Sequence, residues 1–268
     1  MLCTAVLVGG YLAVSSNDAQ SSAVNPPAGL LLTYGEAPSA FGRLQVPELV
    51  ANPPLVVLYH GGFWRRSGGD LNVMAPMADA FVERGYAVWN VEYGRTGERF
   101  GGWPYTFDHV AQSLEILDTF EADYGVDVSL PVLIGHSAGG HLALWAGANS
   151  SMNLGGVIAL APVVDLELAA ENRLGNGAVS TLLGGGPTDV PNRYREASIV
   201  SLGSVPAAVI TSSSDESVPA VYSIGVRGDR LIEHRLDSVE HLSMIRTDGE
   251  TWTVITEQVE DFLLTRDQ

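Results

Sequence analysis

The sequence LIGHSAGGHLAL, residues 133–144, passes from an apolar run through a glycine-rich bend into helix-forming residues. A lone serine, Ser137, stands at the bend between Gly135 and Gly139. Glycines on both sides remove side chains that would clash in a sharp turn from a strand into a helix. The pattern G-x-S-x-G in this setting predicts that the Ser137 hydroxyl is presented at the carboxyl end of a parallel sheet, ready to act as a nucleophile.

Short apolar runs alternate with amphipathic stretches from Leu30 onward, which is typical of βαβ units around a parallel sheet. Strands are predicted at residues 30–35, 41–47, 54–60, 86–93, 131–135, 155–162, 205–212 and 231–236, with the first two as an antiparallel pair. Helices are predicted at residues 74–84, 106–125, 141–148 and 252–264. The sequence therefore predicts an α/β fold with a mostly parallel central sheet and helices on both faces.

A single domain is predicted over residues 30–268, because the pattern continues without an internal repeat or a linker. Residues 165–204 are rich in Gly, Asn and Ser and have the weakest periodicity, which predicts a small insertion over the sheet. The sequence does not distinguish an insertion that covers the site from one at its periphery.

Residues 1–29 differ in composition from the rest of the chain. The apolar run at 2–14 is too short to span a bilayer comfortably and has no preceding Lys or Arg, so an extension is favoured over a secretory signal. Polar residues ending in two prolines follow and predict a linker. This interpretation favours a cytoplasmic protein over a secreted one and includes no membrane span.

The chain has 31 acidic residues against 14 basic ones, a formal net charge of −17, and every basic residue is arginine. A field of that sign repels phosphate backbones, so nucleic acid is excluded as a partner and a small molecule is expected. The only cysteine, Cys3, excludes an internal disulfide and a multi-cysteine metal site. No histidine–carboxylate spacing or glycine-rich phosphate loop points to a metal or a cofactor. The oligomeric state is not encoded in any of these features.

A serine nucleophile needs a histidine base, and in this architecture the histidine comes last in the chain. Only His234 and His241 follow residue 141. His234 falls inside the predicted strand 231–236, which favours a structural role. His241 lies in a loop between the last strand and the last helix, which is at the sheet edge where the catalytic base is expected. We therefore predict that His241 is the base.

The carboxylate that orients the base should precede it and follow a buried strand. Asp215 stands just beyond the strand 205–212, and a gap of two residues separates it from Val218-Pro219, which suits a tight loop. Glu216 is the nearest alternative, and Asp237 is a more distant one. We predict that Asp215 is the acid of a Ser137–Asp215–His241 triad.

An oxyanion hole requires backbone N–H donors beside the nucleophile. The sequence HGGFW at 60–64 ends an early strand with two glycines, which let the backbone approach a substrate closely. The N–H groups of Gly62 and Phe63, together with that of Ala138, are the predicted donors. His60 is expected to organise this loop rather than to act as a base.

These motifs resemble those of α/β-hydrolases of the esterase and lipase superfamily, in particular the branch of kynurenine formamidase-like and carboxylesterase-like enzymes. The resemblance rests on HGGFW (60–64), NVEY (90–93), GGWP with TFDHV (101–110), GHSAGGHLA (135–143), DESVP (215–219) and EHLSMI (240–245). It runs from about residue 34 to the C-terminus and implies the same triad and oxyanion positions. Relatives often carry an arginine pair after the fourth strand, where this chain has Gly94-Arg95.

Two tryptophans and a histidine near these motifs allow more than one interpretation. Trp64 and Trp103 lie in loops at the expected mouth of the site, where each suits either stacking on a substrate or packing beneath the loops. His141 stands one helical turn after Ser137, and we expect it to make a structural hydrogen bond.

The leading interpretation is a carboxylesterase that cleaves small carboxylic esters through an acyl-enzyme. The alternatives are an N-formylkynurenine formamidase, which acts on an aryl formamide, and an acetyl esterase acting on polysaccharide. A non-catalytic binding protein on the same scaffold is disfavoured because all three triad residue types are present.

Overall fold

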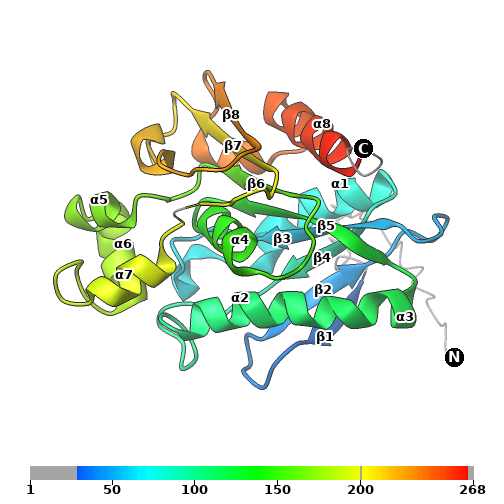
Figure 1. The fold of residues 1–268 in the computed structure, drawn as a ribbon, viewed down its shortest axis with the longest axis horizontal. Coiled ribbons are helices and arrows are strands. Elements are labelled where there is room, and N and C mark those ends of the chain that lie inside the picture. Colours follow the sequence, from blue (N-terminus) through cyan, green and yellow to red (C-terminus); the bar gives the residue numbers. More distant parts are fainter. Residues whose placement is uncertain (1–28, 200, 265–268) are drawn as a thin grey trace, which may run out of the picture.

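The computed structural model describes residues 29–199 and 201–264 (Figure 1). The predicted N-terminal extension and linker, Gly29 excepted, lie outside the described residues. None of the described helices is long and apolar enough to cross a membrane.

Eight strands of the described chain form one sheet in the order β1-β2-β4-β3-β5-β6-β7-β8, and Figure 1 labels them. Their bounds are β1 (Leu30–Thr33), β2 (Phe41–Gln45), β3 (Pro54–Tyr59), β4 (Ala87–Val91), β5 (Asp127–His136), β6 (Gly156–Leu160), β7 (Ala207–Ser212) and β8 (Leu231–Leu236). As predicted, β1 and β2 pair antiparallel; β2 also runs antiparallel to β4, and all pairs from β4 to β8 are parallel. The predicted mostly parallel sheet is confirmed.

The central strands are the most apolar because helices cover both of their faces. Every residue of β4 and β6 is buried, and only the first residue of β3 is partly exposed. Every residue of the edge strand β1, and every residue of the edge strand β8 except the last, is exposed or partly exposed. The core therefore lies along β3, β4, β5 and β6, and the carboxyl ends of these strands carry the loops that follow.

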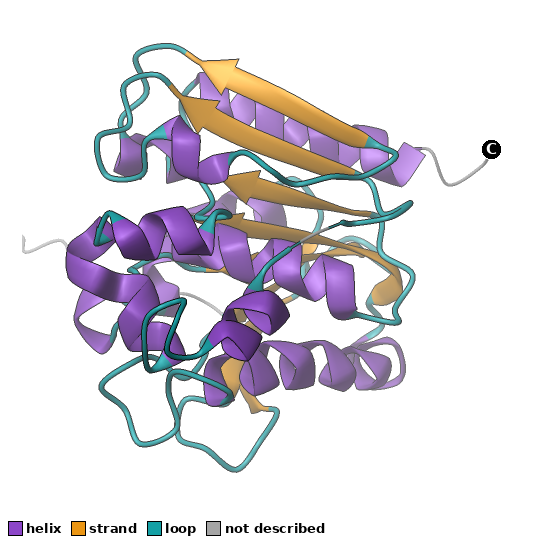
Figure 2. Ribbon diagram, turned by 60° about the vertical axis from the view of Figure 1, so that its left-hand side comes forward, coloured by secondary structure: helices purple, strands orange, loops and turns teal. Residues whose placement is uncertain are grey.

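Helices lie on both faces of the sheet, as predicted (Figures 1 and 2). The main ones are α1 (Ala75–Glu83), α2 (Tyr105–Glu115), α3 (Phe120–Tyr124), α4 (Ala138–Asn149) and α8 (Glu250–Leu264). On one face α1 and α8 meet through the rings of Phe81 and Trp252, whose centroids are 4.8 Å apart. On the other, α2 and α4 meet through Phe107 and Trp145, 5.0 Å apart.

The helices predicted at 74–84 and 252–264 are found within two residues of those bounds, whereas the other two differ more. The helix predicted at 106–125 is divided into α2, a 3₁₀ segment at Ile116–Thr119 and α3, and it ends at Gly125 in the left-handed conformation (φ 67°). The helix predicted at 141–148 begins three residues earlier, at Ala138. The small residues 138–140 have no apolar periodicity that could reveal this start.

The segment predicted as an insertion contains three short helices between β6 and β7. These are α5 (Leu166–Glu171), α6 (Leu174–Leu183) and α7 (Pro191–Ala197). Gly175, Asn176 and Gly177 have left-handed dihedrals and kink α6, which explains the weak periodicity. The three helices lie together on the side of the molecule opposite α3 (Figure 1).

Candidate active site

Ser137 stands at the junction between β5 and α4 in a backbone conformation that is rare for a residue with a side chain. Its φ is 56° and its ψ is −120°. Two hydrogen bonds hold it there, from Ser137 N to Leu160 O at 2.7 Å and from His141 N to Ser137 O at 3.1 Å. Such strain persists only where the surroundings impose it, and it is concentrated at functional sites.

The two glycines flanking Ser137 allow α4 to approach the sheet closely. A Cβ atom on Gly135 would lie 2.1 Å from Gly139 O, and one on Gly139 would lie 2.1 Å from Tyr59 O. Both distances are far below van der Waals contact with backbone atoms. The G-x-S-x-G spacing is therefore a packing requirement of this bend as well as a motif.

Asp215 and His241 come together from two different loops at the carboxyl edge of the sheet. His241 begins the 3₁₀ segment His241–Ile245, and its Nδ1 lies 2.6 Å from Asp215 Oδ2. The other oxygen, Oδ1, accepts backbone N–H groups from Ser217 at 2.9 Å and Val218 at 2.8 Å. Burial alone would raise the pKa of Asp215, but the hydrogen bonds from His241, Val218 and Ser217 outweigh it and lower that pKa. The carboxylate is therefore ionised and oriented.

The structure places the alternative residues differently. Asp237 is exposed and accepts a hydrogen bond from the Ser213 hydroxyl. Glu216 is exposed beside Asp215. His234 lies within β8, paired with Ile210 of β7. Only Asp215 among the three carboxylates contacts the His241 ring.

Ser137 and His241 line one cleft of about 530 Å³. The cleft is also lined by Gly61, Gly62, Phe63, Arg65, Ser67, Gly68, Val73, His136, Ser217, Leu242 and Ile245. Two of the predicted oxyanion residues, Gly62 and Phe63, are among them. The lining is mainly apolar, with a few polar groups near the serine, which is typical of small-molecule sites.

The loop after β3 runs directly past Ser137. A Cβ atom on Gly61 would lie 3.2 Å from the Ser137 Cβ, and Gly62 and Phe63 both have positive φ, 115° and 52°. Within the described part of the chain, the N–H groups of Gly62, Phe63 and Ala138 donate to no protein acceptor. These three donors are therefore available to a group bound beside Ser137.

A buried carboxylate that the sequence analysis did not single out holds this loop in place. Glu92 follows β4 and accepts from His60 Nε2 at 3.1 Å and from Leu71 N at 3.0 Å, and Arg95 Nε lies 3.3 Å away. His60 also stacks on Tyr93 with a centroid distance of 4.3 Å. This agrees with a role for His60 in organising the loop. The NVEY motif contained the signal for Glu92, since a lone acid in a buried strand end needs partners.

His136 is a second residue that the sequence analysis missed. It is buried beside Ser137, its Nε2 lies 3.0 Å from His241 O, and the two imidazole centroids are 4.5 Å apart. Burial, then the neighbouring His241, lowers the pKa of His136 to about 3, so the ring is neutral. A neutral ring can bond to a carbonyl only as a donor, so Nε2 carries the proton. His136 therefore anchors the backbone of the residue predicted as the base.

The remaining predicted residues lie outside the cleft lining. Trp64 is fully buried, edge-on to His141 at 5.4 Å, so the structure shows the packing alternative for it. Trp103 is half-buried, packs on Phe107 at 5.1 Å and donates its backbone N–H to Leu182 O. His141 donates to Ala197 O at 2.9 Å, which confirms the expected structural hydrogen bond.

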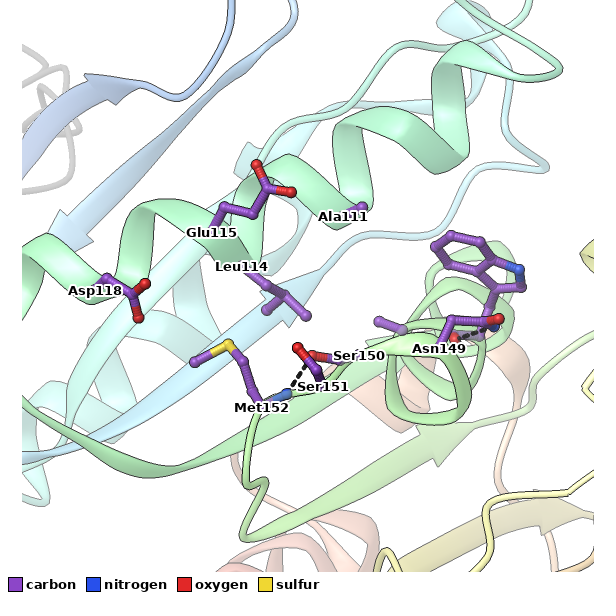
Figure 3. A pocket seen from close by; sticks show the side chains of 10 residues that line it. Ala111, Leu114, Glu115, Asp118, Asn149, Ser150, Ser151 and Met152 are labelled. Carbon is purple, nitrogen blue, oxygen red and sulfur yellow. Dashed lines mark hydrogen bonds between the residues drawn. The ribbon is translucent and has the colours of Figure 1, made fainter.

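A second pocket of about 240 Å³ lies between α2 and the end of α4 (Figure 3). Glu115 and Asp118 are among the residues that line it on one side, and Asn149, Ser150 and Met152 line it on the other (Figure 3). It contains serines but no histidine to activate them. Among the described residues, no group of three or more His, Cys, Asp or Glu is placed to hold a metal ion.

Comparison with models of protein families matches residues 44–227 to the BD-FAE family. The matched segment is more than half of the chain and runs from β2 through the elbow to the residues beyond Asp215. The chain belongs to the BD-FAE family. No curated protein sequence gives a significant match.

Solved structures similar to this BD-FAE chain share its fold at low sequence identity. The bifunctional GH43-CE protein of Bacteroides eggerthii has a TM-score of 0.72 at 18% identity, covering 87% of this chain. This chain spans only 37% of that protein. A truncated carbohydrate esterase from gut microbiota has a TM-score of 0.71 at 16% identity, over 87% of this chain and 94% of that one. The butyrate-bound esterase Est2 of Thermogutta terrifontis has a TM-score of 0.66 at 17% identity, covering 90% of this chain and 95% of that one. These likenesses establish the α/β-hydrolase fold.

Proposed function

We propose that the protein is a serine hydrolase that cleaves small carboxylic esters through an acyl-enzyme on Ser137. The observation that carries this proposal is the 2.6 Å contact between His241 Nδ1 and Asp215 Oδ2, in a cleft that His241 shares with the strained Ser137. An oriented imidazole beside a presented hydroxyl is the arrangement that nucleophilic acyl transfer requires.

Acylation begins when His241 Nε2 takes the Ser137 hydroxyl proton and the serine oxygen bonds to the ester carbonyl carbon. The carbonyl oxygen becomes an oxyanion, which accepts hydrogen bonds from the N–H groups of Gly62, Phe63 and Ala138. When the bond from carbon to the alcohol oxygen breaks, His241 returns the proton to the departing alcohol. Asp215 stays ionised and stabilises the imidazolium throughout.

Deacylation repeats these steps with water as the nucleophile. His241 removes a proton from the water, whose oxygen bonds to the acyl carbon. The bond to the serine oxygen then breaks, and His241 gives the proton back to Ser137. The products are one carboxylic acid and one alcohol, and the enzyme is unchanged.

The size of the cleft supports small esters. A volume of about 530 Å³ with Val73, Leu242 and Ile245 in the wall suits a short apolar acyl chain. Leu242 is 68% exposed although it is a large apolar side chain, which is expected where a substrate covers it.

The first test is the rate of Ser137→Ala and wild type on p-nitrophenyl acetate, butyrate and octanoate. We expect serine-dependent turnover that decreases for the longest chain, and loss of turnover in the variant. Removal of the triad serine costs about a millionfold in kcat in an unrelated protease. A folded variant that keeps more than a small fraction of wild-type activity would show that the nucleophile is a different residue.

A second candidate within the same chemistry is deacetylation of a carbohydrate. It is supported by the structural likeness to a carbohydrate esterase and to an acetyl ester-xyloside bifunctional hydrolase. Acetate release from acetylated xylan, measured beside p-nitrophenyl acetate, tests it.

N-formylkynurenine belongs in the same assay, because HGGFW and GHSAGG resemble the formamidase motifs. Dominant formamide cleavage would reassign the protein to that activity.

A further inference from the structure

The cleft that contains Ser137 and His241 has a charge opposite to that of the protein. The chain carries 31 acidic and 14 basic residues, yet no Asp or Glu is among the residues that line the cleft. Arg65 is the one permanently charged side chain in that lining. Asp215 lies behind His241, and its side chain is only 1% exposed. Its carboxylate oxygens accept hydrogen bonds from His241, Ser217 and Val218.

Arg65 is held at the cleft by its backbone. Arg65 N donates to Gly62 O at 3.0 Å, Arg65 O accepts from Gly68 N at 2.9 Å, and the residue forms a β-bridge with Thr96. Its position is therefore tied to the same loop that carries the predicted oxyanion donors.

The Arg65 guanidinium is not neutralised by a carboxylate. Its Nη2 donates to Asn176 O at 3.1 Å, and no ion pair among the described residues includes it. By contrast, Arg95 lies against both Glu92 and Glu98. A guanidinium has five N–H donors, so a single bond to a backbone carbonyl leaves most of its fork available.

We propose that Arg65 binds a carboxylate on the substrate, so that the preferred esters carry a carboxylate on either the acyl or the alcohol part. A guanidinium matches a carboxylate with two parallel hydrogen bonds, and it selects that group over a neutral one of similar shape. The inference rests on the proposed ester hydrolysis at Ser137 and names the substrate class of that site.

The test compares each carboxylate ester with a neutral partner of similar shape. The alcohol arm uses para-acetoxybenzoate against its methyl ester, and the acyl arm uses mono-p-nitrophenyl adipate against p-nitrophenyl hexanoate. In each arm the quantity is the ratio of kcat/KM for the anionic ester to that for the neutral one, after subtraction of spontaneous hydrolysis. Because both rates come from one preparation, a loss of folded enzyme cancels in the ratio.

Three variants isolate the role of Arg65. Arg65→Gln removes the charge and should lower the ratio about tenfold in at least one arm. Arg65→Lys keeps the charge and should restore part of the ratio. Arg66→Gln removes the same charge from an exposed neighbour outside the cleft lining and should change the ratio by less than about twofold, since exposed charges are screened. The arm that responds identifies which part of the ester carries the carboxylate.

The outcomes separate this proposal from the one on which it rests. Serine-dependent turnover of the neutral esters with equal ratios in wild type and Arg65→Gln in both arms would overturn the carboxylate site and leave the ester hydrolase intact. An equal fall of the kcat/KM ratio in Arg66→Gln would show that the overall electrostatic field of the protein causes the effect. That result would also overturn the carboxylate site. No serine-dependent turnover of any ester would remove the proposed function itself.

Discussion

Asp215 and Asp237 follow neighbouring parallel strands, β7 and β8, but their environments differ. Asp215 is buried and accepts from His241, Ser217 and Val218, whereas Asp237 is exposed and accepts from a serine hydroxyl. Only the first can hold the His241 imidazole with Nε2 free to accept a proton.

Asp215→Asn should therefore lower kcat by about ten-thousandfold, the cost of the same change in an unrelated protease, because an amide holds the wrong histidine tautomer. Asp237→Asn is the matched control and should keep nearly all activity. The measurement is kcat on p-nitrophenyl acetate for both variants. A large loss in Asp237→Asn with little loss in Asp215→Asn would reverse the assignment of the acid.

His136 should act as a positioning residue, since its Nε2 proton anchors the carbonyl of His241. His136→Leu removes this donor, and we expect kcat to fall roughly tenfold to a hundredfold with little change in KM, because a misplaced base slows the chemical step. His136→Gln keeps an N–H donor at a similar reach and should recover part of kcat. Equal losses in both variants would mean that the ring itself, and not its hydrogen bond, is required.

The contact between α4 and the sheet depends on the glycines at its first turn. Gly139 has no room for a Cβ atom, which would lie 2.1 Å from Tyr59 O in β3. The backbone of the helix must therefore move if any side chain is added, and Ser137, two residues earlier, would move with it.

Gly139→Ala should lower the free energy of unfolding by about 1–3 kcal/mol or more, because about 1–3 kcal/mol is the usual cost of overpacking. Gly249→Ala, at a position with no atom within 4 Å of the added Cβ, is the matched control and should change it by less than about 0.5 kcal/mol. Urea unfolding followed by circular dichroism measures both. Wild-type stability in Gly139→Ala would show that α4 can shift freely, against the packing described here.

Two neutral histidines in the interior make the free energy of unfolding depend on pH. Burial and the neighbouring His241 lower the pKa of His136 to about 3, and burial lowers that of His141 to about 4. In the unfolded chain both would titrate near the ordinary value of about 6.5. Below that pH the unfolded chain binds protons that the folded chain does not, so the free energy of unfolding should fall as the pH falls from about 6.5 towards 4.

His141→Gln removes one of these two sites while keeping an amide donor for Ala197 O. Each such histidine contributes about 1.4 kcal/mol per pH unit in that window, so the variant should lose about that much of the slope. The measurement is urea unfolding of both proteins at several pH values between 4 and 7. Parallel curves for wild type and variant would mean that His141 is protonated in the folded protein.

The sequence alone is enough to predict the strand pattern, the antiparallel start and the strand-to-helix bend at Ser137. These features depend on local periodicity and on turn chemistry, which neighbouring residues encode. It also selects Asp215 and His241, because the chain order in this architecture leaves few candidates, and the fold brings them to 2.6 Å. Their catalytic roles stay predictions until the variants are measured.

Only the tertiary structure decides what lies across from each of these residues. It buries Trp64 in the interior and joins His136 to the backbone of His241. It also brings His60 and Leu71 to Glu92, and it leaves Arg65 without an ion pair among the described residues, in a cleft wall that contains no Asp or Glu. Each of these partners is far away in sequence or on another element. Periodicity reports which face of an element is buried, but the identity of the atoms that meet it depends on how distant elements pack.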